Sequence, residues 1–103
     1  MNIFKTVCID QIPKVIEAAK EKLSIREKLQ PLLDAGWLEG EAAAHYTIRR
    51  QPPRVWVTAE PNQDGSFTIY SGPGGVHCKV QSVAEVLEFA DKLKKAVEVA
   101  DLN

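Results

Sequence analysis

The hydrophobic positions of the N-terminal third repeat with helical spacing. Apolar residues recur at the i, i+3, i+4, i+7 and i+11 positions that form one face of an α-helix: Ile12, Val15, Ile16, Ala19 and Leu23. Charges of both signs occupy the other positions, which is typical of a solvated helix face. Asp10 stands where an N-cap belongs, because its carboxylate can accept hydrogen bonds from the first free N–H groups of a helix. The pattern therefore predicts an amphipathic helix that begins after Asp10.

A proline interrupts this helical pattern. Pro31 lacks the N–H of a helical hydrogen bond and its ring clashes one turn back, so we expect a kink or break near Gln30. A short turn would follow and end at Gly36, which suits the C′ position of a helix. Residues 3–9, before the helix, are rich in β-branched and apolar side chains and predict a short strand or an extended arm.

The pattern changes to a period of two from His45 onward. The alternating runs are residues 45–49, 54–60, 66–70 and 76–80. Turn residues separate them, because Pro52-Pro53 cannot continue a strand ladder and Asp64-Gly65 is a strong hairpin signal. Residues 39–44 fit a loop or a helical turn equally well. The sequence thus predicts an antiparallel meander of three to four strands.

The C-terminal segment has the strongest helical pattern. Ser82 and Glu85 form a capping box, in which each side chain can bond a free backbone N–H. Apolar residues then repeat at helical spacing: Val83, Val86, Leu87, Ala90, Leu93, Val97 and Ala100. We predict a helix whose apolar stripe is buried.

The element order defines the expected fold. Apolar helix stripes must be buried, and one face of the sheet is the available partner. We therefore predict an α+β, two-layer sandwich in which a kinked N-terminal helix and a C-terminal helix pack on one face of the meander. The chain has 103 residues, of which 45% are hydrophobic and 26% charged, as in an ordinary folded domain. Residues 1–103 are thus expected to form a single domain.

Composition limits the cellular locations and the classes of binding partner that the sequence suggests. The net charge of -1 removes the simplest argument for binding nucleic-acid phosphates, without forbidding such binding. Two cysteines, Cys8 and Cys78, fit reduced thiols in the cytoplasm, and a single bridge between them is the alternative. No apolar run approaches the roughly 20 residues of a membrane span, and the N-terminus lacks the features of a signal peptide. The expected location is the cytoplasm.

Motifs for catalysis, cofactors and metals are missing from the sequence. Residues 72–75 are glycine-rich, but a strand is predicted after them, whereas a phosphate loop needs a helix there. His77 and Cys78 are neighbours in a predicted strand and point to opposite faces, so they do not share a metal, and His45 has no histidine one helical turn away. No sequence pattern places a nucleophile beside a base. We therefore expect no catalytic, cofactor or metal site.

A cluster of arginine and aromatic residues is the best candidate for a binding surface. Its members are Tyr46, Arg49, Arg50, Arg54, Trp56 and Tyr70. Arginine and tryptophan are enriched in binding hot spots, and arginine can bind carboxylates or phosphates. If helices cover one side of the sheet, then four residues line the other: Trp56, Thr58, Thr68 and Tyr70. The alternative interpretation is a solvated strand end, with Trp56 packed on the second face of the sheet.

These observations favour a small non-catalytic binding or regulatory protein of the inhibitor, antitoxin, immunity or accessory-factor type. Such a protein acts by contacting another protein, or as a homodimer. A nucleic-acid-binding module is the first alternative, since the α-β-β-β-α order resembles a double-stranded RNA-binding domain, and the helix, Gly36-Trp37 and hairpin resemble a winged helix. The diagnostic residues of both families are missing. A small enzyme or small-molecule binder is the third hypothesis.

Overall fold

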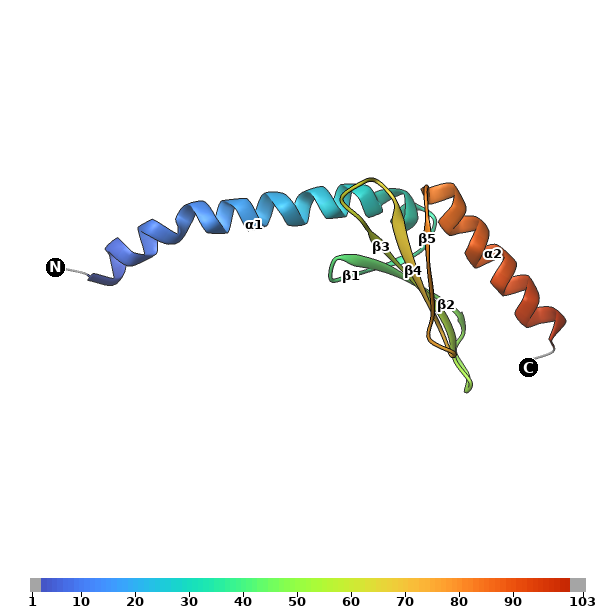
Figure 1. Cartoon of the computed structure of the whole chain (residues 1–103). Coiled ribbons are helices and arrows are strands. Elements are labelled where there is room, and N and C mark those ends of the chain that lie inside the picture. The colour runs from blue at the N-terminus through green and yellow to red at the C-terminus, as the bar shows by residue number, and fades with distance from the viewer. Residues whose placement is uncertain (1–2, 101–103) are drawn as a thin grey trace.

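The protein has an α+β fold in which the C-terminal helix and the C-terminal part of the N-terminal helix lie against one face of an antiparallel sheet (Figure 1). The computed structural model describes the backbone of residues 3–100 and the side chains of residues 9–100. The elements follow in the order α1 (Ile3–Asp34), β1 (Leu38–Gly40), β2 (Ala43–Arg49), β3 (Val55–Pro61), β4 (Phe67–Gly72), β5 (Val76–Val80) and α2 (Val83–Val99). The predicted fold class is therefore confirmed.

Helix α1 is longer than the sequence predicts. It includes residues 3–9, so the strand or extended arm expected there is wrong, and Asp10 lies within the helix and does not cap it. The helix also continues past Pro31 to Asp34, so the expected break is wrong. Pro31 is exposed and lies in the last turn of α1. The loss of one hydrogen bond there does not interrupt the helix.

The end of α1 was predicted correctly. Gly36 has a φ of +96°, a left-handed conformation that glycine adopts without a Cβ penalty. The Trp37 N–H donates to the Leu32 carbonyl and the Gly36 N–H to the Leu33 carbonyl, each at 3.0 Å. These two bonds form a Schellman motif, which turns the chain from the helix into the sheet.

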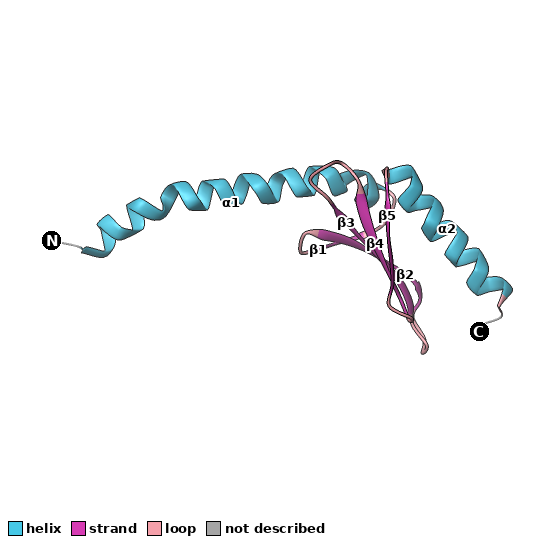
Figure 2. Cartoon of the chain, in the orientation of Figure 1, coloured by secondary structure: helices cyan, strands magenta, loops and turns pink. Residues whose placement is uncertain are grey.

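The sheet has five strands in the order β1-β2-β3-β4-β5, so the predicted count of three to four is too low (Figure 2). The strand missed is β1, which has three residues and pairs with β2 through a tight turn at Glu41 and Ala42. Ala42 has a φ of +57°. A strand of three residues is too short to show alternation, and its pairing with β2 is a tertiary property.

One face of the sheet is buried under the helices. Val55, Val57 and Ala59 of β3 all point into this inner face, as their alternation predicts. The core also contains residues from both helices, from β2 and β4 and from the connection between α1 and β1: Leu29, Leu32, Trp37, Ala44, Phe67, Ile69, Val86 and Ala90. The prediction that helices cover a single face is therefore right for α2 and for the C-terminal part of α1.

Helix α2 begins at the capping box that the sequence predicts. The Ser82 hydroxyl accepts from the Glu85 N–H at 3.3 Å, and the Glu85 carboxylate accepts from the Gln81 N–H at 2.8 Å. The first turns bury Val86 and Ala90 against the sheet, whereas the later apolar positions are half-buried or exposed. Figure 1 shows α2 beside the sheet, with its C-terminal end leaving the body of the molecule.

The N-terminal part of α1 projects away from the rest of the molecule, residues 25–100, which we call the body (Figure 1). We call residues 9–24 the free segment, because all their side chains are exposed. The molecule is 69 Å long but only 28 Å and 23 Å across. The expectation that Ile12, Ile16 and Leu23 pack on the sheet is therefore wrong. Within residues 3–100, no helix is both long and apolar enough to cross a membrane.

Candidate functional site

The outer face of the sheet, opposite the helices, carries aromatic and histidine side chains. The strand register aligns one residue from each of the five strands in a row across this face: Leu38, His45, Thr58, Tyr70 and His77. Trp56 lies in the next row, between Thr47 and Gly72. We call His45, Trp56, Tyr70 and His77 the aromatic face. Because strand residues alternate between faces, these side chains point away from the core.

Trp56 lies on the backbone of the neighbouring strand. A Cβ placed on Gly72 would come within 2.6 Å of the indole atoms Cε2 and Cζ2. Glycine in a strand often marks such a close approach. The indole is therefore supported from below by Gly72 while 37% of the residue stays exposed. A large aromatic ring that is held and partly exposed suits contact with a partner.

The other three rings are also held by their neighbours. The His45 ring lies over Gly40, where a Cβ would overlap it, and His45 Nδ1 is 2.8 Å from the Thr58 hydroxyl. Tyr70 and His77 have ring centroids 5.9 Å apart with planes tilted by 31°. Tyr70 is 39% exposed. The face is therefore preorganised, because its rings have neighbours that restrict their rotamers.

Arg54 lies at the edge of a shallow depression in this face. The depression has a volume of about 340 Å³ and includes His45, Thr47, Trp56 and Thr58 in its lining. A guanidinium beside an indole can bind a carboxylate while the ring contacts an apolar group. The chemistry of this surface is thus aromatic contact with a cationic border.

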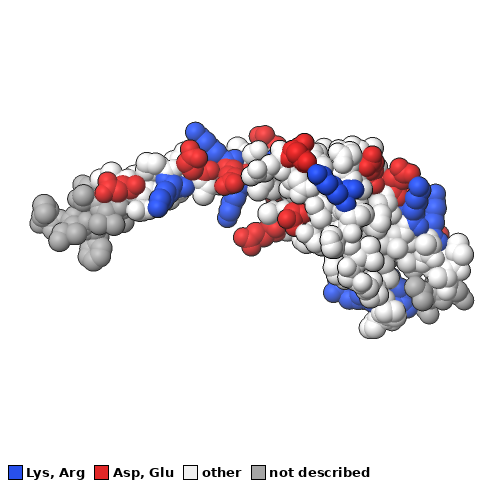
Figure 3. Space-filling view, viewed as in Figure 1, with Lys and Arg blue, Asp and Glu red and all other residues white. Residues whose placement is uncertain are grey.

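The structure divides the six predicted binding residues between two sides of the sheet. Arg54, Trp56 and Tyr70 belong to the outer surface. Tyr46 lies on the inner side, where its ring stacks on Trp37 with centroids 5.4 Å apart. Arg49 and Arg50 line a groove between the β2–β3 loop and the end of α2. Figure 3 shows basic side chains near the tip of the body that this loop forms.

Arg49 has a structural role in the loop. Its guanidinium Nη1 donates to the carbonyls of Gln51 at 2.6 Å and Pro53 at 2.9 Å. These bonds fix the turn between β2 and β3, so Arg49 holds the loop that positions Arg54 and Trp56. A β-bulge between Thr47 and Arg49 changes the alternation, which explains why Arg49 and Trp56 are on different sides.

Sequence reasoning missed two members of the aromatic face. His45 and His77 were considered as metal ligands, although their alternation with Ala44 and Cys78 already placed them opposite the core. Their position beside Thr58 and Tyr70 depends on strand register, which local sequence does not specify. Cys78 is a free cysteine, half-buried on β5, and the side chain of Cys8 lies outside the described residues.

The turn between β3 and β4 is fixed by a carboxylate. Asp64 accepts hydrogen bonds from the Ser66 hydroxyl and N–H and from the Lys79 ammonium, and these donors hold its pKa well below the ordinary value of 3.8. Lys79 is therefore paired within the chain, at 2.9 Å. Among the described side chains, no group of three acidic, histidine or cysteine residues could hold a metal ion.

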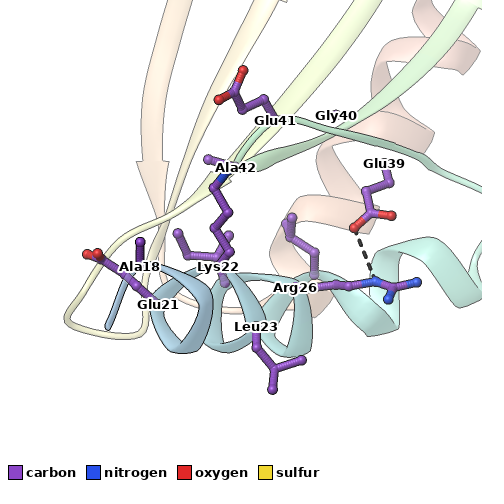
Figure 4. A pocket seen from close by; sticks show the side chains of 11 residues that line it. Ala18, Glu21, Lys22, Leu23, Arg26, Glu39, Gly40, Glu41 and Ala42 are labelled. Atoms are coloured by element: carbon purple, nitrogen blue, oxygen red, sulfur yellow. Dashed lines mark ion pairs between the residues drawn. The ribbon is translucent and has the colours of Figure 1, made fainter. Parts of the chain in front are cut away.

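A second hollow, of about 580 Å³, lies between α1 and the β1–β2 hairpin (Figure 4). We call it the α1 groove. Ala18, Ile25 and Leu29 form its apolar floor. Arg26 Nε lies 3.1 Å from a carboxylate oxygen of Glu39, and this ion pair links the helix to the hairpin. The groove is wide and amphipathic, and it begins where the free segment joins the body.

No family model matches this chain, and no curated protein or solved structure matches it either. The aromatic face and the surfaces of α1 therefore carry the functional argument by themselves.

Proposed function

We propose that this protein is a non-catalytic protein-binding module that contacts its partner through the aromatic face. The observation that supports this proposal is a sheet face that neither helix covers, on which Trp56 and Tyr70 are partly exposed and yet held in place. Tryptophan, tyrosine and arginine dominate binding hot spots, because they contribute large contact areas at a low entropic cost.

The arrangement also indicates the chemistry of the partner. Arg54 offers a planar cation beside the indole of Trp56, and both line the same depression. The partner surface that fits best presents an apolar side chain to the ring and a carboxylate to the guanidinium. Burial of such a pair also excludes water from the charge contact.

Affinity capture followed by titration tests the proposal. The full chain is used to capture proteins from its native cell, and the affinity of each purified partner is then measured by calorimetry. Trp56→Ala should weaken binding by about thirtyfold or more, since a hot-spot tryptophan contributes about 2 kcal/mol. Val99→Ala, on the exposed end of α2, is the matched control and should bind like the wild type. Equal binding by a folded Trp56→Ala variant would rule out this face.

Gly72→Ala offers a second test that leaves every aromatic side chain in place. The new methyl group would displace the indole of Trp56, because it cannot fit at 2.6 Å. We expect a shift in tryptophan fluorescence and weaker partner binding from the same variant. Gly65→Ala is not a suitable control because Gly65 has a positive φ, so Gln63→Ala, at an exposed position of the same turn, is preferred.

Binding of single-stranded nucleic acid is a second candidate function. It is favoured by the position of ring side chains on adjacent strands of an uncovered sheet face, because unpaired bases stack on such rings. Fluorescence anisotropy with single-stranded DNA and RNA at low salt tests it, with duplexes as the comparison. Binding that weakens with salt and with Tyr70→Ala would support this function, and no binding at low salt would exclude it.

A further inference from the structure

We propose that two copies of this chain pair through the free segment of α1, with the helices parallel. The seam consists of five residues that follow one another at alternating steps of three and four: Ile9, Ile12, Ile16, Ala19 and Leu23. This is the spacing of the a and d positions of a coiled coil, and it continues for more than two heptads. The proposal concerns a surface separate from the aromatic face and does not depend on the function proposed above.

The first argument is that the free segment needs a partner. Ile12, Ile16 and Leu23 are 53%, 49% and 56% exposed. Pro13 and the β-branched residues lower the intrinsic helix propensity of this segment. Most helices in proteins are stabilised by packing of an apolar face, and the side chains of residues 9–24 are all exposed in the single chain. Covering the apolar face of the free segment would therefore stabilise its helical state.

The second argument is that the body of the same chain cannot cover it. The part of α1 that packs on the sheet does so through Ile25, Leu29 and Leu32. At 100° per residue, the centre of the seam lies roughly 150° around the helix from that packed face. The seam therefore faces away from its own sheet. The helix of a second copy can lie along the seam without meeting the body, and the two bodies then point away from each other.

The third argument concerns the charges beside the seam, which select the parallel arrangement. In a parallel pair, Lys22 at a g position lies opposite Glu27 at the following e position of the second helix. Both residues are exposed, and within the described residues neither has an ion pair in its own chain. Figure 4 shows Lys22 extended along the α1 groove toward Ala42, so pairing requires this flexible side chain to turn from the hairpin to the second helix. Two-fold symmetry forms this contact twice. An antiparallel pair instead places Lys22 opposite Val15, and Lys20 opposite Pro13, where no opposite charge is available.

The contact between Arg26 and Glu39 explains where the seam ends. Arg26 is the next d position after Ala19, and in a parallel pair it would approach its own copy. The Arg26 guanidinium forms an ion pair with Glu39 of the same chain at 3.1 Å (Figure 4). This ion pair directs the guanidinium toward the β1–β2 hairpin and neutralises its positive charge. A seam this short lies at the small end of specific interfaces, so we expect a reversible dimer. Figure 3 shows charges of both signs along the visible side of the free segment, as in a helix that pairs selectively.

Sedimentation equilibrium of the full chain tests the pairing. The wild type should show a monomer–dimer equilibrium in the micromolar range, and Ile16→Asp should weaken it by about a hundredfold, because the seam would have to bury a charge. Lys14→Asp, on the other side of the helix, is the matched control and should dimerise normally. A wild-type protein that stays monomeric up to hundreds of micromolar would overturn the proposal, and so would a dimer that Ile16→Asp leaves unchanged.

Charge reversal tests the orientation independently of helix stability. Lys22→Glu and Glu27→Lys should each weaken the dimer roughly tenfold, since each replaces two attractive contacts by repulsive ones. The double variant should restore the affinity, which a merely structural effect of either substitution would not do. Two weak single variants whose effects simply add in the double variant would contradict the parallel arrangement. A trimer in place of a dimer would also overturn the proposed pairing.

Discussion

The two parts of helix α1 have similar amphipathic sequences and opposite surroundings. In the C-terminal part, Leu29 and Leu32 are 1% and 0% exposed, under the sheet. In the free segment, the large apolar residues are about half exposed, and only its C-terminal end borders the α1 groove. The comparison shows that amphipathy indicates that a helix face will be covered, but not which surface covers it. One apolar face meets the sheet of its own chain, and the other is available for a second molecule.

Core substitutions should give the largest difference between the two parts. Leu32→Ala leaves a cavity beneath the sheet, and we expect it to lower the free energy of unfolding by about 2–5 kcal/mol. Ile12→Ala in the free segment should change unfolding of the body by less than about 0.5 kcal/mol. Urea titrations followed by tryptophan fluorescence measure both, because Trp37 and Trp56 belong to the body. Equal losses from the two substitutions would mean that the free segment packs on its own body.

Substitution of the two prolines of α1 should have effects of intermediate size that differ between the two parts of the helix. Pro31→Ala restores one helical hydrogen bond near the packed end and should stabilise the body by about 1 kcal/mol. Pro13→Ala should leave unfolding of the body unchanged and should tighten the dimer, because it favours the helical state of the free segment. Thermal unfolding and sedimentation separate the two effects. A Pro13→Ala variant that stabilises the body as much as Pro31→Ala would contradict the independence of the two parts.

Amide exchange should distinguish the same two parts within one molecule. The amides of residues 25–34 should be protected nearly as well as the core strands, since they open with the whole body. Amides of residues 9–24 should exchange rapidly in dilute protein and slowly in concentrated protein, because pairing protects them. The measurement is hydrogen exchange by NMR at several concentrations. Protection of residues 9–24 that does not depend on concentration would argue against pairing.

Acid should have the smallest effect, and it should affect the body alone. The pKa of Asp64 is lowered in the folded state, so its hydrogen bonds stabilise the fold above the ordinary pKa. That contribution is lost as the pH falls below about 4, where the unfolded carboxyl takes up a proton first. Asp64→Asn should therefore flatten the dependence of Tm on pH in this range, with Glu60→Gln as the control. A wild-type and variant Tm that fall in parallel would contradict this role.

Some elements could be predicted because their signals are local. The α2 capping box places Ser82 and Glu85 three residues apart, and the bond from the Glu85 N–H to the Ser82 hydroxyl forms as expected. The Glu85 carboxylate bonds the Gln81 N–H instead of the Ser82 N–H that a capping box predicts. Gly36 ends α1 for a similarly local reason, since it adopts a positive φ. The predictions for residues 3–9 and Pro31 were wrong because each used one local preference. Both segments continue the helix, because helical hydrogen bonding along the rest of α1 outweighs a preference at a single position.

The candidate site was only partly predictable for a different reason. Trp56 and Tyr70 were placed on the outer face correctly, because strict alternation is enough to separate the two faces of β3 and β4. Tyr46 and Arg49 were grouped with them by proximity in the sequence. The alternation of β2 and the bulge after Thr47 place both on the helix side. Strand register decides which residues of different strands lie side by side on one face of a sheet. Register is a property of pairs of strands and cannot be derived from one strand alone.

The sequence by itself determined the class of the fold, the inner and outer faces of the central strands, the start of α2 at Ser82 and the end of α1 at Gly36, because each depends on residues a few positions apart. Tertiary structure decided the existence of β1, the row of rings on the outer face, and which of the two apolar faces of α1 meets the sheet. These features depend on contacts between segments far apart in the chain. The free energy of such contacts comes from burial, and burial is set by the whole arrangement of the elements.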